Sequence, residues 1–282
     1  WSRDKDDNKL RSYLVSNLLL CSWLQDIWTW RPWVSVTGET NSGKTAFFGF
    51  ITKYFGPQMA LSMGSSSEAG LRQSIGTSSK IMLLDEFEAS KERTKTLDWL
   101  KNAGAGNASV RGTPGQYAVK GKVKVMPWFG SIEACTTNES ERNRYIMFPM
   151  ASRIGKPRFT LPTDEDIKIL RSKSLAILMR VWVRAKELHE HLQHKCEIKG
   201  VYSRYTESHS LPIAMWAAIA GMTNTEAESL FYESIGTMMA NIQFNSESEH
   251  GTLINEILFS KVDCGRGERR MVSELLTGLS QS

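Results

Sequence analysis

The chain has 282 residues, of which 41% are hydrophobic and 23% charged, and its formal net charge is +5. This is the composition of an ordinary globular protein, and the absence of any run of about 18 apolar residues argues against a membrane-spanning segment. The cysteines are isolated and form no C-x-x-C pair, which argues against a disulfide framework or zinc ribbon and favours a reducing cytoplasm. Because the chain begins with Trp1 rather than Met, we interpret it as a fragment truncated at both ends.

The N-terminal part predicts a helix, a short strand and a second helix. Apolar side chains recur every three or four residues over 8–28, which predicts an amphipathic helix that ends before Pro32. Residues 33–36 favour a strand, and a glycine-rich loop follows directly. Residues 46–55 are apolar on most sides, as in a helix packed behind a sheet.

The next segment contains the most apolar strand of the chain. Residues 59–79 are rich in Ser and Gly, with a helical piece over 68–75, and residues 81–84 form a continuous apolar run typical of a buried parallel strand. A helix is predicted over 91–103. Further strands are predicted over 109–112 and 117–125, joined by a turn at Pro114-Gly115, and over 128–132 and 145–150.

From Asp164 onward the pattern becomes helical. Thr163 is a suitable N-cap, and the acidic residues that follow it suit the positive end of a helix dipole. Two more helices are predicted over 211–221 and 225–240. The expected organisation is an N-terminal helical segment (1–30), an α/β core (31–155) and a C-terminal helical region (156–282).

The loop after the first strand matches the phosphate-binding pattern G-x-x-x-x-G-K-[ST] in full. Its glycines let consecutive backbone N–H groups surround phosphate oxygens, and the following helix directs its positive end toward them. The lysine is expected to reach the β- and γ-phosphates of ATP, and the threonine hydroxyl is expected to bind Mg²⁺. The predicted nucleotide site comprises Gly38, Glu39, Thr40, Asn41, Ser42, Gly43, Lys44 and Thr45.

Two acids follow the apolar strand at 81–84. They lie at the carboxyl end of a strand, where ligands bind in open α/β sheets. Asp85 is the candidate for holding the metal, and Glu86 is the candidate for orienting and polarising the attacking water.

These motifs resemble those of AAA+ P-loop ATPases, and more narrowly the superfamily-three-like helicase domains of phage, plasmid and viral primase-helicases. The matching residues are the P-loop, 83–86, and the stretch 141–149 with its arginines, apolar strand and proline. Residues 67–73 also resemble a segment that such phage proteins place between the two nucleotide motifs. The resemblance covers residues 10–150.

The resemblance implies an arginine finger, which acts on the nucleotide of a neighbouring subunit. Arg144 is the first candidate and Arg142 the second, because a guanidinium can fork onto phosphate oxygens. It also implies a polar sensor, for which Asn138 is the choice and Glu133 the competitor.

Basic residues surround the predicted hairpin. Lys120, Lys122 and Lys124 alternate with apolar residues, and Arg111 lies across the turn. One interpretation is a solvated strand face. The other is the hairpin of superfamily-three-like helicases, whose lysines would follow the backbone of single-stranded DNA.

The sequence thus predicts an α/β fold with an AAA+-type three-layer core, a mostly parallel sheet, a β-hairpin insertion and a helical C-terminal region. The expected function is an ATP-driven DNA helicase or translocase of a phage or mobile element, acting as a homo-oligomer in a hexameric ring, with ATP and Mg²⁺ between subunits. One alternative is a DNA-remodelling initiator or transposition regulator that does not unwind. The other is a signalling ATPase whose nucleotide gates oligomerisation.

Overall fold

The computed structural model describes most of the chain, and its residues form two compact units, Trp1–Tyr232 and Glu233–Ser282. In the second unit, the strands β8 (Lys261–Asp263) and β9 (Arg269–Met271) form an antiparallel pair. The described ranges are 5–63, 68–76, 78–88, 91–104, 109–112, 118–121, 124–133, 139–151, 160–195, 203–238, 261–263 and 269–271.

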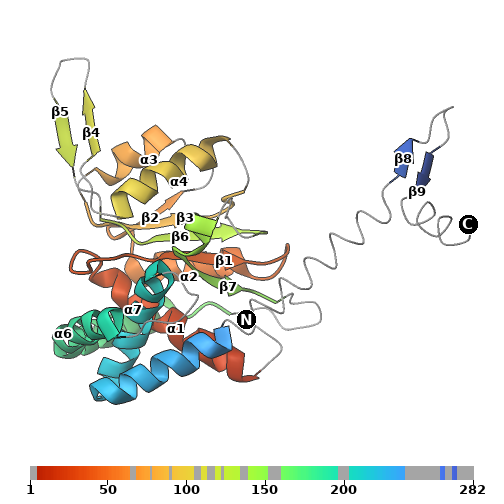
Figure 1. The fold of residues 1–282 in the computed structure, drawn as a ribbon. Coiled ribbons are helices and arrows are strands. Elements are labelled where there is room, and N and C mark those ends of the chain that lie inside the picture. Colours follow the sequence, from red (N-terminus) through yellow and green to blue (C-terminus); the bar gives the residue numbers. More distant parts are fainter. Residues whose placement is uncertain are drawn as a thin grey trace, which may run out of the picture. The chain divides into compact units, whose positions relative to one another are not determined.

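The centre of the first unit is a five-stranded sheet in the order β2-β3-β6-β1-β7 (Figure 1). All of its pairs are parallel, and β1 lies between β6 and β7. The α/β fold with a parallel sheet of the P-loop type, a hairpin insertion and C-terminal helices is therefore confirmed. The strands are β1 (Trp33–Thr37), β2 (Ala60–Met63), β3 (Ile81–Leu84), β6 (Pro127–Ser131) and β7 (Tyr145–Pro149).

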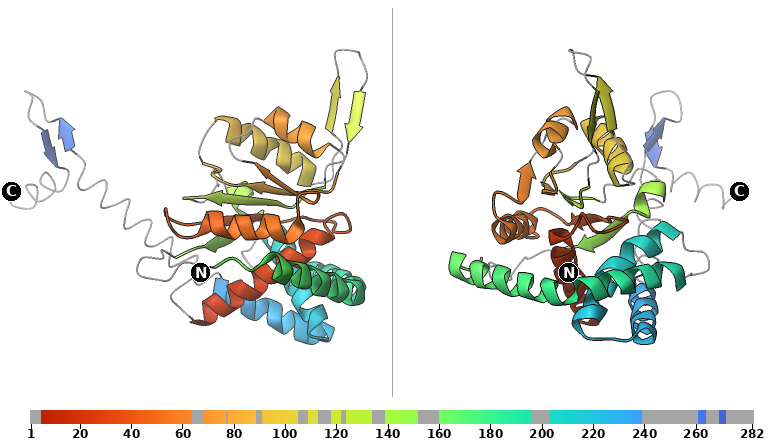
Figure 2. Two further views of the ribbon diagram at one scale, coloured as in Figure 1. Left: turned by 180° about the vertical axis from the view of Figure 1, so that it is seen from behind. Right: turned by 90° about the vertical axis from the view of Figure 1, so that its left-hand side faces the viewer.

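Helices cover both faces of this sheet (Figure 2). On one face, α3 (Glu68–Ile75) and α4 (Lys91–Gly104) share a buried core with Phe129 of β6. On the other face, α2 (Lys44–Phe55) places the Phe47 ring 6.3 Å from the ring of Trp128. Since Trp128 and Phe129 are successive strand residues, their side chains point to opposite faces of the sheet. The result is three layers with β6 near the middle.

The remaining helices pack together beside β7. α7 (Ser203–Ile219) contacts α1 (Lys5–Trp23), β7 and the long α6 (Asp164–Lys195). Thr163 caps α6 as expected: its Oγ1 accepts from Asp166 N at 3.2 Å, while Asp166 Oδ2 accepts from Thr163 N at 3.0 Å. A further helix runs over residues 224–238, and the four-residue α5 (Glu139–Arg142) precedes β7.

The hairpin follows α4 and stands away from the sheet (Figure 1). Its strands, β4 (Ser109–Gly112) and β5 (Ala118–Gly121), pair antiparallel as expected. Two expected boundaries are wrong: β5 ends at residue 121 instead of 125, and α7 begins at 203 instead of 211. The sequence analysis also missed β2.

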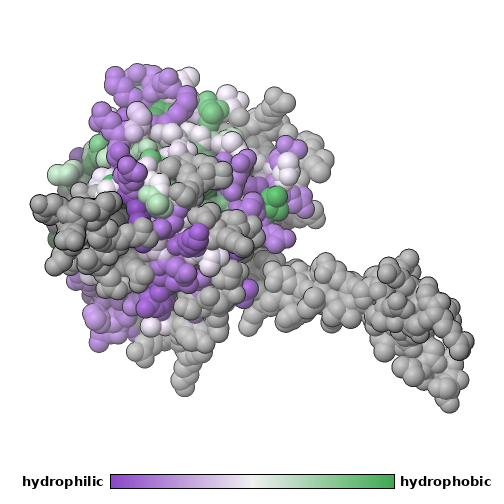
Figure 3. All heavy atoms as spheres, turned by 90° about the horizontal axis from the view of Figure 1, so that it is seen from above, coloured by the Kyte–Doolittle hydropathy of each residue, from purple (hydrophilic) through white to green (hydrophobic). Residues whose placement is uncertain are grey.

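One face of the first unit is largely polar where it is described. Viewed from above, its coloured residues are mostly hydrophilic, with hydrophobic ones scattered among them (Figure 3). Within the described residues, no helix is both long and apolar enough to cross a membrane.

Candidate functional site

The P-loop connects the end of β1 to the start of α2 and is closely turned. Gly38 N donates to the carbonyl oxygens of Ser131 and Ile132, each at 3.3 Å, so the loop begins beside the end of β6. A Cβ at Gly38 would lie 2.7 Å from Met150 O and 2.8 Å from Ser42 Oγ, and only glycine fits there. Asn41 and Gly43 adopt positive φ angles of 66° and 98°, which curl the backbone ahead of the helix.

The Lys44 ammonium lies within the curl of this loop. It donates to Gly38 O and to Glu39 O, the latter at 3.1 Å, and lies 3.5 Å from Ser42 Oγ. Ser42 is buried, whereas Thr45, Glu39 and Thr40 are exposed. The ammonium and an exposed hydroxyl are therefore presented at the N-terminus of a 12-residue helix, which is an arrangement suited to a polyphosphate.

Asp85 and Glu86 follow β3 at the same edge of the sheet as the P-loop, since the strands are parallel. Asp85 is half-buried and its Oδ1 accepts from Glu86 N at 3.1 Å. The same oxygen lies against Gly130 of β6, where an added Cβ would be 2.6 Å from it and 3.1 Å from the Phe48 ring. The carboxylate therefore lies beside α2, one turn beyond Lys44. Glu86 is exposed, with a φ of 55°.

Hydrogen bonds that the sequence analysis missed join the ends of β3 and β6. Phe87 N donates to Gly130 O at 2.8 Å, and Ile132 N donates to the Glu88 carboxylate at 2.7 Å. Because Gly38 also bonds to residues 131 and 132, the segment after β6 connects the P-loop to the acidic segment after β3. A glycine within an otherwise apolar strand was the only sequence signal for this contact.

The donor set at this edge fits a nucleotide with Mg²⁺. Carboxylate and hydroxyl oxygens are the ligands that Mg²⁺ prefers, and Asp85 and Thr45 supply one of each. A Cβ at Gly38 would obstruct the curl of backbone that a phosphate group needs. Asp85, Thr45 and the P-loop backbone thus offer the types of ligand that the predicted cofactors, ATP and Mg²⁺, require.

The two candidate arginines lie at the opposite, amino edge of the sheet. Arg142 ends α5 and is exposed, whereas Arg144 immediately precedes β7 and is 7% exposed. The first residue of β7, Tyr145, pairs with Trp33, the first residue of β1. The length of β1, roughly 13 Å at the usual rise per residue, separates this edge from the P-loop. The arginines are thus remote from the phosphate site of their own chain.

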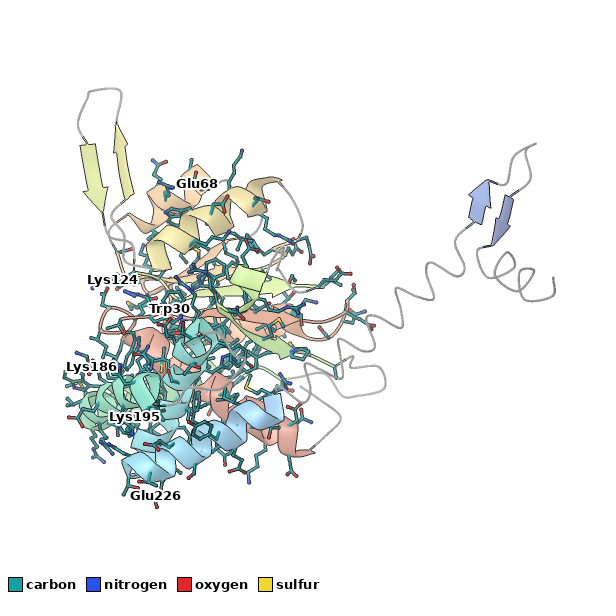
Figure 4. All side chains as sticks on the ribbon, viewed as in Figure 1. Trp30, Glu68, Lys124, Lys186, Lys195 and Glu226 are labelled. Carbon is teal, nitrogen blue, oxygen red and sulfur yellow. The ribbon has the colours of Figure 1, made fainter. Side chains whose placement is uncertain are left out.

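The remaining candidates differ in how far the structure describes them. Asn138 and Lys122 lie outside the described residues, and the competing sensor Glu133 is exposed. In the hairpin, Lys120 pairs with Val110 and Arg111 pairs with Val119. Lys124 lies at the base of the hairpin (Figure 4), and its ammonium donates to Asp26 O at 3.2 Å. This contact ties Lys124 to the segment after α1.

Comparisons with known proteins give structural neighbours only. No family model matches the chain, and no curated protein matches it. The apo C-terminal region of NrS-1 is similar at 13% identity and a TM-score of 0.39, over 74% of this chain and 62% of that one. Cch of SCCmec type IV, described as an active helicase, is similar at 14% identity and a TM-score of 0.42, over 92% of this chain and 53% of that one.

The chain therefore spans only about three fifths of the length of the first of these structures. A second structure of the same NrS-1 region, in its A form, gives 12% identity and a TM-score of 0.37, over 76% of this chain and 66% of that one. At these values we base the functional proposal on the residues of this chain alone.

Proposed function

We propose that this chain is the ATP-hydrolysing motor of a ring-forming DNA helicase or translocase, and that it acts in the replication of a phage or other mobile element. The observation that carries the proposal is the meeting of a curled P-loop and the Asp85 carboxylate at the carboxyl edge of the sheet. Gly130, which has no Cβ, lets the Asp85 carboxylate lie close to Phe48 of the helix that follows the P-loop.

The proposed roles follow from the position of each group. Backbone N–H groups of residues 38–45 bind the phosphates, and Lys44 exchanges its loop carbonyls for β- and γ-phosphate oxygens. Thr45 and Asp85 hold Mg²⁺, which supplies charge neutralisation on the triphosphate when bound. Glu86 orients the attacking water, and Asn138 or Glu133 contacts the γ-phosphate as sensor.

The arginines support a nucleotide site shared between subunits. Because Arg142 and Arg144 lie at the amino edge, either can reach a triphosphate only across an interface with a second copy. We propose Arg144 as the first candidate for this contact and Arg142 as the second; Arg142 is exposed, whereas Arg144 is buried. That the ring has six subunits is also part of the proposal.

The hairpin is the proposed contact with single-stranded DNA. It projects from the core after α4, and its basic residues Arg111, Lys120 and Lys122 supply charges for phosphate contacts. Lys124 serves as an anchor for the hairpin base, because its ammonium already binds Asp26 O.

The proposed organisation keeps the helical segment 1–30, the ATPase core 31–155 and the helical region 156–282.

ATP turnover with and without single-stranded DNA tests this proposal. We expect Lys44→Ala to abolish turnover while the circular dichroism spectrum stays unchanged. Lys168→Ala, which removes an exposed lysine of α6, is the matched control and keeps wild-type turnover. Unchanged turnover in Lys44→Ala would refute the nucleotide site.

Strand displacement and particle mass separate the helicase from its alternatives. A remodelling ATPase is stimulated by DNA without displacing a strand, and a signalling ATPase is not stimulated. A ring-forming motor gains mass when a non-hydrolysable ATP analogue and single-stranded DNA are added together. A monomer under those conditions contradicts the shared site.

A further inference from the structure

Two arginines lie against the same tryptophan at the amino edge of the sheet. The guanidinium carbon of Arg144 is 5.3 Å from the centroid of the Trp30 ring, and that of Arg204 is 4.9 Å from it. Arg144 also lies 5.6 Å from the Trp33 ring. Trp30 lies between the sheet and α7 (Figure 4), and we call Arg144 and Arg204 the Trp30 arginine pair.

The tryptophan that carries this pair is fixed in place. Its Nε1 donates to Ser208 Oγ of α7 at 3.0 Å, and that hydroxyl donates onward to Asn143 O at 3.4 Å. Trp30 is 8% exposed and Ser208 is completely buried. Both guanidinium groups therefore lie against one ring that is fixed between the turn before β7 and the first turns of α7.

Neither arginine of the pair has an anionic partner. Among the residues that the structure describes, no hydrogen bond and no ion pair involves either guanidinium. Nε and Nη1 of Arg144 and Nη1 of Arg204 are buried without an acceptor. An unsatisfied buried donor is costly, and more so when it is charged. The pair is thus a concentration of positive charge whose buried donors lack hydrogen-bond acceptors.

The surrounding carboxylates offset this charge only in part. Glu141 is 3% exposed and forms an ion pair with Lys101 at 2.7 Å. Glu207 forms no ion pair with a described residue, and burial raises the pKa of its carboxyl although the charges of Arg204 and Arg144 act in the opposite direction. The pKa of Arg144 is lowered, first by burial and then by the charge of Arg204, while the charges of Glu141 and Glu207 oppose this shift.

The start of α7 adds to the positive potential. Arg204 is the second residue of this 17-residue helix, and the first turn contains no acidic residue. Peptide dipoles leave partial positive charge at a helix N-terminus, which normally attracts acidic residues. Here the dipole and Arg204 have the same sign, which is unfavourable unless an anion joins them.

We propose that Arg144 and Arg204, held on Trp30 at the start of α7, form a binding site for a phosphate oxyanion. A guanidinium presents a planar fork of donors that matches the oxygens of a phosphate group, and two forks can engage one tetrahedral group. Arg204 is half-buried and is the more exposed of the two arginines, while the unpartnered donors of Arg144 are buried.

The phosphate has two possible sources, which the experiment separates. One source is free phosphate or pyrophosphate. The other is the triphosphate on the P-loop of a second copy, and this source rests on the proposed function. In that case Arg204 and Arg144 act together across the interface, and Trp30 is their positioning residue.

The first test measures pyrophosphate binding without using hydrolysis. In a Lys44→Ala background, we expect titration calorimetry to detect binding that Arg204→Gln weakens by about tenfold, as expected for loss of a charged hydrogen-bond donor. Arg204→Lys, which keeps the charge but loses the fork, should give an intermediate affinity. Arg180→Gln removes an exposed arginine of α6 and should leave the affinity unchanged.

The second test measures ATP turnover in mixtures. We expect Arg204→Gln to reduce turnover about tenfold, and addition of Lys44→Ala chains with intact Arg204 to restore part of it if the phosphate belongs to a second copy. Weaker pyrophosphate binding with unchanged turnover in Arg204→Gln supports the free source, and restored turnover in the mixture supports the shared one.

The site is overturned if pyrophosphate binds all variants equally and Arg204→Gln hydrolyses ATP at the wild-type rate. Arg204 is the variant of choice because it is half-buried, and a circular dichroism spectrum verifies its fold. If the wild-type chain hydrolyses no ATP, the proposed function fails, while the pyrophosphate titration still decides the oxyanion site.

Discussion

Asp85 Oδ1 lies directly against the backbone of Gly130, close enough that a Cβ on Gly130 would be 2.6 Å from it. The two residues belong to neighbouring parallel strands, near the carboxyl ends of β3 and β6. The same added Cβ would lie 3.1 Å from the ring of Phe48 in α2. A glycine at this position therefore determines how closely Asp85 can approach the helix that follows the P-loop.

The first prediction is that Gly130→Ala impairs the metal-binding carboxylate. The added methyl must displace Asp85 or Phe48, since real Cβ contacts do not occur at 2.6 Å. A displacement of about 1 Å at a reacting group typically costs on the order of a hundredfold in rate. We expect ATP turnover to fall by at least tenfold and the Mg²⁺ concentration for half-maximal turnover to rise. Wild-type turnover in Gly130→Ala would contradict the role of Asp85.

Gly49→Ala is the matched control and a prediction of its own. Gly49 lies inside α2, and a Cβ there meets no atom within 4 Å. Replacing glycine by alanine in a helix interior stabilises by about 0.5–1 kcal/mol, mainly through the entropy of the unfolded chain. We expect a higher urea midpoint with turnover unchanged. If Gly49→Ala were destabilised instead, α2 would have a contact at this position, and the effect of Gly130→Ala would have the same origin.

The elements that the sequence predicted correctly depend on local patterns. The P-loop is a contiguous segment whose glycines have local geometric reasons, and the strand 81–84 is marked by four apolar residues in a row. The start of α6 is equally local, because Thr163 and Asp166 cap the helix through bonds three residues apart.

The parts that were missed depend on tertiary contacts. β2 follows a turn in a Ser-rich segment and becomes a strand because it pairs with β3 at the sheet edge. The Lys120–Lys124 alternation predicted a longer strand, yet Lys124 binds a carbonyl at residue 26, almost a hundred residues away. The helix expected over 211–221 begins at Ser203 instead, and Pro212 lies inside it.

The third prediction concerns Gln25, which joins the entrances of two strands. Its Oε1 accepts from Met126 N at 2.7 Å, just before β6, and its Nε2 donates to Ser79 O, just before β3. Gln25 is 1% exposed, so Gln25→Leu leaves the buried N–H of Met126 and the part-buried carbonyl of Ser79 without this partner. We expect the free energy of unfolding, measured with urea, to fall by about 2–4 kcal/mol. A change below about 0.5 kcal/mol would show that water replaces the amide.

The fourth prediction is that two buried histidines destabilise the fold in mild acid. Burial lowers the pKa of His189 to about 3 and that of His209 to about 4, from an ordinary value of 6.5. Both stay neutral in the folded chain, whereas the unfolded chain takes up protons below pH 6.5. Stability is therefore complete above pH 6.5 and declines as the pH falls toward 4 and then 3. At pH 5 the loss is about 2 kcal/mol for each histidine.

His189→Leu isolates the contribution of one histidine. His189 Nε2 has no partner, and Ser210 Oγ, which contacts its Nδ1 at 3.0 Å, also donates to Glu207 O at 3.2 Å. The substitution therefore leaves no donor of Ser210 without an acceptor. We expect the difference in unfolding free energy between pH 7 and pH 5 to shrink by about 2 kcal/mol relative to the wild type. An unchanged difference would mean that His189 is protonated in the folded chain.

The last prediction concerns the buried ion pair that joins α1 to β7. Arg11 Nε donates to both oxygens of Asp7, at 2.9 and 2.8 Å, and its Nη1 donates to Met147 O at 3.0 Å. Because Asp7 is 3% exposed, Arg11→Met removes the charge opposite a buried carboxylate and should cost about 3–5 kcal/mol. The double variant Asp7→Leu with Arg11→Met removes both charges, and we expect it to be more stable than Arg11→Met alone. If urea denaturation shows the double variant to be the less stable of the two, then the apolar contacts of Asp7 and Arg11, rather than their charges, hold α1 against the sheet.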